Sequence, residues 1–240
     1  MQIRLRFALA ALIGAMLLGG GCTQGPPPYG MEQPSSLPGR KRQVWAVAPV
    51  VNLSGQKAVD PITQADLVYQ QLQQVEGLTA IPVNRTAEVL YSLRLERVQS
   101  EQQAALVCDL LGCDGLIVPT ITAYDPYNPP KLGASLQLFH KPVDYARQAS
   151  VSPREMARQA TPSVNQSTPP AAGVIQVVGM YDAENGSVRT ALFRYAHGRH
   201  DPGGPMGARE YLVSMDRYCG FVYHVLIADL LNSPKLRRGQ

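Results

Sequence analysis

The order of apolar and polar positions along the first part of the chain predicts a strand followed by a helix. Val44–Val51 (VWAVAPVV) is a compact apolar run of the kind that forms a buried strand, and Asn52 to Gly55 follow it as a turn. Behind Pro61, apolar residues recur at spacings near three and four, which predicts an amphipathic helix with Asp60 as its N-cap. Gly77 ends this helix, and Leu78–Val83 is a second short strand.

Two further helices precede the most apolar strand. Asn84 begins the first of them, and Ser100 followed by Gln103 forms a capping box that begins the second. Gly112 is positioned to end this helix, since glycine is the residue that most often terminates helices. The run Leu116–Tyr124 then predicts the third strand.

The second half of the chain predicts antiparallel strands and a closing helix. Apolar and polar residues alternate over Leu132–Leu138, and Val174–Tyr181 is another strand. The Asn185-Gly186 pair is a strong hairpin signal, so we expect Ser187–Tyr195 to return as a partner strand. A broad apolar face predicts a final helix over Glu210–Leu231.

These elements together predict an α/β fold, a single three-layer-like sandwich of a mixed sheet with helices over residues 44–232. Residues 140–172 carry Pro, Ser, Gln, Ala and Arg without an apolar period, so we interpret them as a polar surface insertion. Residues 233–240 are expected to be a C-terminal tail.

The beginning of the chain has a different pattern. Arg4 and Arg6 precede an uncharged apolar run over residues 7–18, and three glycines then lead to Cys22. A run of about a dozen residues is too short to span a bilayer, so residues 1–21 are predicted to be a secretory signal peptide. Residues 22–43 are rich in Pro, Gly and Ser, which indicates a flexible linker.

The segment ending at Cys22 resembles the signal of bacterial lipoproteins. The resemblance implies cleavage before Cys22 and lipid attachment to this residue, which anchors the chain to a membrane. Thr23 stands where an Asp would mark inner-membrane retention, so the resemblance implies the outer membrane, facing the periplasm. The alternative is an ordinary signal peptide with Cys22 an incidental thiol.

Charge and cysteine content narrow the functional classes. The formal net charge of +4 falls to about +2 when Arg4 and Arg6 leave with the signal peptide, and the basic residues are scattered. A nucleic acid partner is therefore not expected. Cys108 and Cys113 lie five residues apart across a predicted helix end, where a disulfide is sterically allowed. Equally, Cys108 and Cys219 fit as small buried residues on helices.

Three short motifs, taken in order, resemble a known group of domains. They are the first strand with its Asn turn (residues 47–52), the helix, glycine and strand over residues 104–118, and the Asp-Ala-x-x-Gly segment over residues 182–186. Together they are similar to the periplasmic lipoprotein domain of the CsgG (curli secretion) and LpoB (penicillin-binding-protein activator) group. The resemblance covers most of residues 44–231.

This resemblance implies a protein that is not an enzyme, needs no cofactor, and either binds another envelope protein or associates with itself. A curli-type pore needs long alternating strands, and residues 140–172 have no such alternation, so pore formation is not expected. No catalytic or phosphate-binding motif is present.

Two hypotheses compete with the adaptor role. A metal-binding protein or enzyme could use His197, His200 and Asp201, although the surrounding glycines favour a solvated loop. A self-assembling ring component of a secretion-type complex is the other. His224 is interpreted as a histidine of the core, and Tyr124, Tyr127, Tyr181 and Tyr195 either cap the sheet edges or form a recognition surface.

Overall fold

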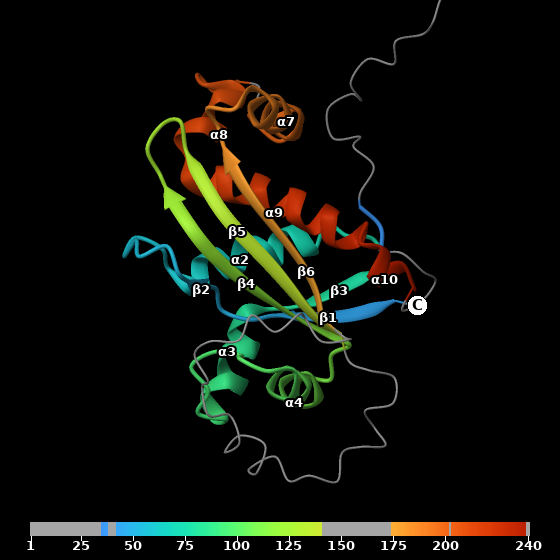
Figure 1. The fold of residues 1–240 in the computed structure, drawn as a ribbon. Helices are drawn as coiled ribbons and strands as arrows, with labels where there is room; N and C mark the ends of the chain where they lie inside the picture. Colours follow the sequence, from blue (N-terminus) through green and yellow to red (C-terminus); the bar gives the residue numbers. More distant parts are fainter. Residues whose placement is uncertain (1–34, 38–41, 141–173, 202, 239–240) are drawn as a thin grey trace, which may run out of the picture. The chain divides into compact units, whose positions relative to one another are not determined.

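A computed structural model describes residues 35–37, 42–140, 174–201 and 203–238 of the chain (Figure 1). These residues form a six-stranded mixed sheet with the order β3-β1-β4-β5-β6, in which the short β2 also pairs with β4. The strands are β1 (Gln43–Val47), β2 (Val51–Asn52), β3 (Leu78–Ile81), β4 (Gly115–Asp125), β5 (Lys131–His140) and β6 (Val174–Asp182).

The sheet is parallel on one side of β4 and antiparallel on the other. β1 pairs in parallel with both β3 and β4, whereas β4, β5 and β6 follow one another as antiparallel neighbours. Gly115 begins β4 opposite Trp45, and a Cβ at Gly115 would lie only 3.1 Å from the Trp45 ring and 3.0 Å from Leu138. A side chain at residue 115 would therefore have to displace one of these two large side chains, which explains the glycine here.

Helices cover both faces of the sheet, which confirms the predicted α/β sandwich. α2 (Pro61–Leu72) and α9 (Met215–Leu231) pack on the face that holds Trp45, Ile117 and Leu136. α3 (Val83–Ser92) and α4 (Glu101–Leu111) pack on the opposite face (Figure 1). The remaining helical segments are α7 (Gly186–Ala196), the 3₁₀ turn Gly207–Arg209, α8 (Glu210–Val213) and α10 (Pro234–Arg238).

The predicted helix ends are largely confirmed. Asp60 caps α2 through a 2.7 Å hydrogen bond from the Thr63 backbone N–H, and Ser100 caps α4 by accepting from the Gln103 N–H. Gly112 ends α4 in the left-handed conformation, with φ of +67°. α2 instead ends at Leu72, and Gly77, with φ of +83°, forms the turn into β3.

The predicted hairpin at Asn185-Gly186 is wrong, because α7 begins there. A type I′ turn needs positive φ at both central residues, but Asn185 has φ of −69° and its side chain accepts a 2.9 Å hydrogen bond from the Ser187 N–H. Asparagine is favoured at helix N-caps as well as in turns. The buried residues Leu192, Tyr195 and Ala196 follow at helical spacing, and their burial favours the helix over the hairpin.

Both ends of the predicted domain extend further than expected. The final helix is divided at Ser214, which caps α9, and the expected tail contains α10, whose Leu236 is buried in the core. Leu37, within the expected linker, is also buried, and its N–H donates to the Glu76 carbonyl.

His140, the first residue of the expected insertion, belongs to β5. The signal peptide, Cys22 and the rest of the expected insertion lie outside the described residues.

Candidate functional site

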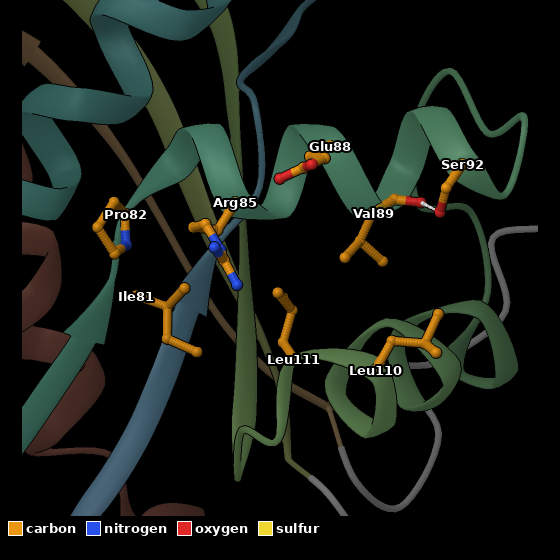
Figure 2. Close-up of a pocket in the computed structure, with 8 residues that line it drawn as sticks. All are labelled: Ile81, Pro82, Arg85, Glu88, Val89, Ser92, Leu110 and Leu111. Atoms are coloured by element: carbon orange, nitrogen blue, oxygen red, sulfur yellow. Dashed lines mark hydrogen bonds between the residues drawn. The ribbon is translucent and has the colours of Figure 1, made fainter.

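A groove of about 580 Å³ lies between α3 and α4, on the face of the sheet opposite α9 (Figure 2). One side of it is a stripe of α3 in which Arg85, Glu88, Val89 and Ser92 recur at helical spacing and so share a face. The end of α4 forms the other side with Leu110 and Leu111. Ile81 and Pro82, at the junction of β3 and α3, close one end.

The lining of the groove is mixed in polarity. Ile81, Val89 and Leu111 are half-buried and Leu110 is 54% exposed, so apolar surface is open to solvent within it. Arg85 and Glu88 are exposed and lie one helical turn apart, which places one charge of each sign at the groove. Figure 2 shows the Arg85 and Val89 side chains from α3 and Leu111 from α4 directed into the space between the helices.

The exposure of Leu110 follows from the position of α4 on the sheet. The buried residues of α4 extend from Gln103 to Cys108, and they include the residues packed against β1 and β4. Ala104, Val107 and Cys108 form one stripe of α4 in the core cluster that includes these strands, and Leu110 lies off this stripe and is exposed. The two leucines before Gly112 were the sequence signal for this site, because Leu110 is an apolar residue at a position off the stripe of α4 that packs on the sheet.

Cys108 and Cys113 meet at the end of α4. The Cys113 N–H donates to the Cys108 carbonyl at 2.9 Å and the Gly112 N–H donates to the Asp109 carbonyl at 3.3 Å, the two hydrogen bonds of a Schellman motif. This motif brings the two cysteine side chains into contact, and both residues are buried thiols in the structure. A hydrogen bond from the Cys108 thiol lowers the pKa of Cys113.

The structure does not assemble His197, His200 and Asp201 as metal ligands. His200 Nδ1 lies 2.8 Å from the Ala196 carbonyl, and Asp201 Oδ1 accepts a 2.9 Å hydrogen bond from the Gly203 N–H. Over the described residues, no group of three or more His, Cys, Asp or Glu side chains is placed to hold a metal ion. The loop hypothesis therefore gains no support from the geometry.

The other aromatic and histidine candidates divide between core and surface. Tyr195 is buried and its ring lies 4.9 Å from that of the half-buried His224, so His224 packs at the edge of the core. Tyr181 contacts Phe221 edge-on, and burial raises its pKa to about 12. Burial likewise raises the pKa of Tyr124 to about 12. Of the four tyrosines, only Tyr127 is exposed.

Two buried glutamines on α2 were not anticipated. The Tyr223 hydroxyl donates to Gln64 Oε1 at 2.9 Å, and the Tyr195 hydroxyl donates to Gln71 Oε1 at 3.1 Å. These bonds join α2 to α9 and α7 inside the core. The sequence signal was that Gln64 and Gln71 stand within Pro61–Leu72 at positions where the helical spacing places buried residues. A buried polar side chain requires a hydrogen-bond partner.

Comparison with known proteins gives likenesses of fold only. No protein-family model and no curated protein matches the chain. The LpoB C-terminal domain from Salmonella enterica is 11% identical, with a TM-score of 0.38 over 72% of this chain and 93% of that one. A PelC dodecamer from Paraburkholderia phytofirmans is 8% identical, with a TM-score of 0.39 over 82% and 93%.

A lipoprotein from Neisseria meningitidis is 12% identical, with a TM-score of 0.35 over 62% of this chain and 91% of that one. At this level of similarity the chain is assigned to no family, and the resemblance to the curli-secretion subunit stays a prediction. No helix in the described part of the chain is both long and apolar enough to cross a bilayer.

Proposed function

We propose that this chain is a lipid-anchored envelope protein that acts without catalysis, by binding another envelope protein. Cys22 carries the lipid, the outer membrane holds the anchor, and the domain faces the periplasm. The groove between α3 and α4 receives the partner. The single observation that carries the binding role is Leu110, which is 54% exposed beside the half-buried Leu111 in a groove of about 580 Å³.

The anchor is supported by the order of residues before Cys22. Two arginines, an uncharged apolar run and three small residues provide each part of a cleavable signal that ends at a cysteine. Each buried CH₂ of an acyl chain contributes about 0.8 kcal/mol, so two or more chains on one residue hold a protein at a membrane stably.

The chemistry of the groove favours a peptide segment as its occupant. A partner side chain that enters between the helices gains apolar contact with Val89, Leu110 and Leu111. Arg85 and Glu88 at the same groove match a segment with an acidic and a basic residue beside its apolar anchor.

The anchor is tested by Cys22→Ala. We expect wild-type chain in the membrane fraction, labelled by an alkyne-tagged fatty acid, and the variant unlabelled and released from the membrane. Labelling that persists in the variant would overturn the assignment of Cys22.

The groove is tested by a photo-crosslinking amino acid placed at Leu110 in living cells, with Leu53 as the matched exposed position outside the groove. We expect one envelope protein to crosslink from Leu110 and not from Leu53. The crosslinked envelope protein, once purified, should bind the wild-type chain and the Leu53→Asp variant. It should not bind the Leu111→Asp or Arg85→Glu variants. Equal crosslinking from both positions, or binding unaffected by the groove variants, would refute the groove as the docking site.

A further inference from the structure

The two edges of the sheet differ in how they are protected. β3 is four residues long and Pro82 follows it, while Ser36 pairs with Glu76 beside it. β6 is nine residues long, and β5 is its one partner in the part of the sheet that the structure describes. Among the described residues, no backbone hydrogen bond reaches the outer side of β6 between Val174 and Tyr181.

β6 lacks the features that normally prevent an edge strand from pairing. Its sequence, VIQVVGMYD, contains no proline and no lysine, its register with β5 is unbroken by a bulge, and its single charge is at the last residue. Val178 is 68% exposed and Met180 is 62% exposed. These are the two large apolar side chains that the described strands expose to this extent. A long, apolar, uncharged edge is a template for another strand.

We propose that the partner of this edge is a second copy of the chain, paired β6 to β6 in antiparallel orientation about a two-fold axis. An isologous contact needs only one surface, which must be complementary to itself. Val178 is the midpoint of Val174–Asp182, so full overlap places Val178 opposite its own copy and Gln176 opposite Met180. These residues share one face of the strand, so their side chains pack across the new pair.

Charge selects the same arrangement. Asp182 is the charged residue of β6, and Lys131 of the same chain lies 2.8 Å from its carboxylate. In the antiparallel pair, each Asp182 lies opposite Val174 of the other copy, so the two carboxylates are at opposite ends of the contact. A parallel, in-register pair would place the two carboxylates side by side, where like charges are destabilising. The inference is independent of the lipid anchor and of the α3–α4 groove.

Thiol crosslinking of the full chain, purified in mild detergent, tests the register. We expect a short bismaleimide to convert most of the Val178→Cys variant into a covalent dimer. Met180→Cys should crosslink poorly alone and efficiently when mixed with Gln176→Cys. Leu53→Cys, exposed but outside the strand, is the control for random encounters and for other thiols.

Light scattering of the same preparations tests the dimer itself. Wild-type chain should have the mass of a dimer, whereas the Val178→Lys and Met180→Glu variants should each have the mass of a monomer. Neither substitution should change the thermal unfolding midpoint of the monomer. Val213→Lys, at an exposed apolar position on α8, should remain a dimer. A monomeric wild type, a dimer or ring unaffected by both β6 variants, or crosslinking of Val178→Cys to a different protein alone would overturn the proposal.

Discussion

Cys108 and Cys113 are the residues at which a local backbone motif determines the available chemistry. The Schellman hydrogen bonds at the end of α4 place the two thiols in contact, in a core cluster that also contains residues of β1 and β4. Formation of a disulfide removes two protons and two electrons, which an added thiol oxidant such as diamide accepts as it is reduced to the hydrazine.

We predict that diamide bridges Cys108 to Cys113 in folded protein. Mass spectrometry of a digest should show the linked peptide, lighter by two hydrogen atoms, while Cys219 remains alkylatable after unfolding. Cys113→Ser should abolish the link. A bridge that forms only in unfolded protein, or that joins Cys219 instead, would contradict the contact.

Asp60 provides a prediction about pH. Hydrogen bonds from the hydroxyl and backbone N–H of Thr63 lower the pKa of Asp60 from its usual value of 3.8. Because the folded-state pKa is the lower one, the charged cap stabilises the protein above the unfolded pKa, and this contribution is lost as pH falls through the folded pKa. Asp60→Ala should therefore lower the unfolding midpoint at neutral pH, with the difference from wild type shrinking in acid. Asp60→Asn, which keeps an oxygen acceptor, should lose less at neutral pH.

At the scale of elements, α7 gives the clearest test of the structure. Gly186 is the first residue of α7, its φ is not positive, and an added Cβ would meet no atom within 4 Å. Gly186→Ala should therefore raise the free energy of unfolding by about 0.4–1 kcal/mol, through reduced freedom of the unfolded chain. In the hairpin predicted from the sequence, the same change would destabilise. Gly112→Ala, at φ of +67°, is the control and should destabilise in urea unfolding.

The buried glutamines of α2 give a second prediction at this scale. Tyr223→Phe leaves the acceptor of Gln64 without the Tyr223 hydroxyl in the core, so we expect a loss of about 1–3 kcal/mol in the free energy of unfolding. Tyr91→Phe, at an exposed tyrosine, should have no effect in the same urea titration. Equal stability of the two variants would show that the bond between α2 and α9 contributes nothing.

The sequence was sufficient for elements whose signals agree with one another. Around α4, Ser100, the apolar period and Gly112 all indicated the same helix, and the apolar run at β4 indicated a strand. Asn185 fits both a hairpin turn and a helix N-cap, and the burial of Leu192 and Tyr195 on one helix face favours the N-cap. The groove could not be predicted without knowing which face of the sheet α4 packs on. Leu110 is apolar, and it is exposed only because of where α4 lies in the folded domain.

At the scale of the whole domain, segments from both ends of the described chain complete the same core cluster. Leu37 and Leu236 are both buried in the cluster that contains Trp45 and the apolar face of α9. Backbone hydrogen bonds also join Leu37 and Ser35 to Glu76, beside the edge strand β3. A domain boundary at residue 44 therefore removes part of the folded unit.

We predict that a fragment of residues 33–240 is more stable than a fragment of residues 44–240, because the shorter one lacks the Leu37 side chain and the hydrogen bonds to Glu76. Leu37→Ala in the longer fragment should reproduce most of the difference, about 2–5 kcal/mol for a buried leucine. Met31→Ala, within the linker but outside the longer fragment, should leave the full chain unchanged. Equal urea midpoints for the two fragments would mean that the linker ends at residue 43, and that Leu37 rests on the core without stabilising it.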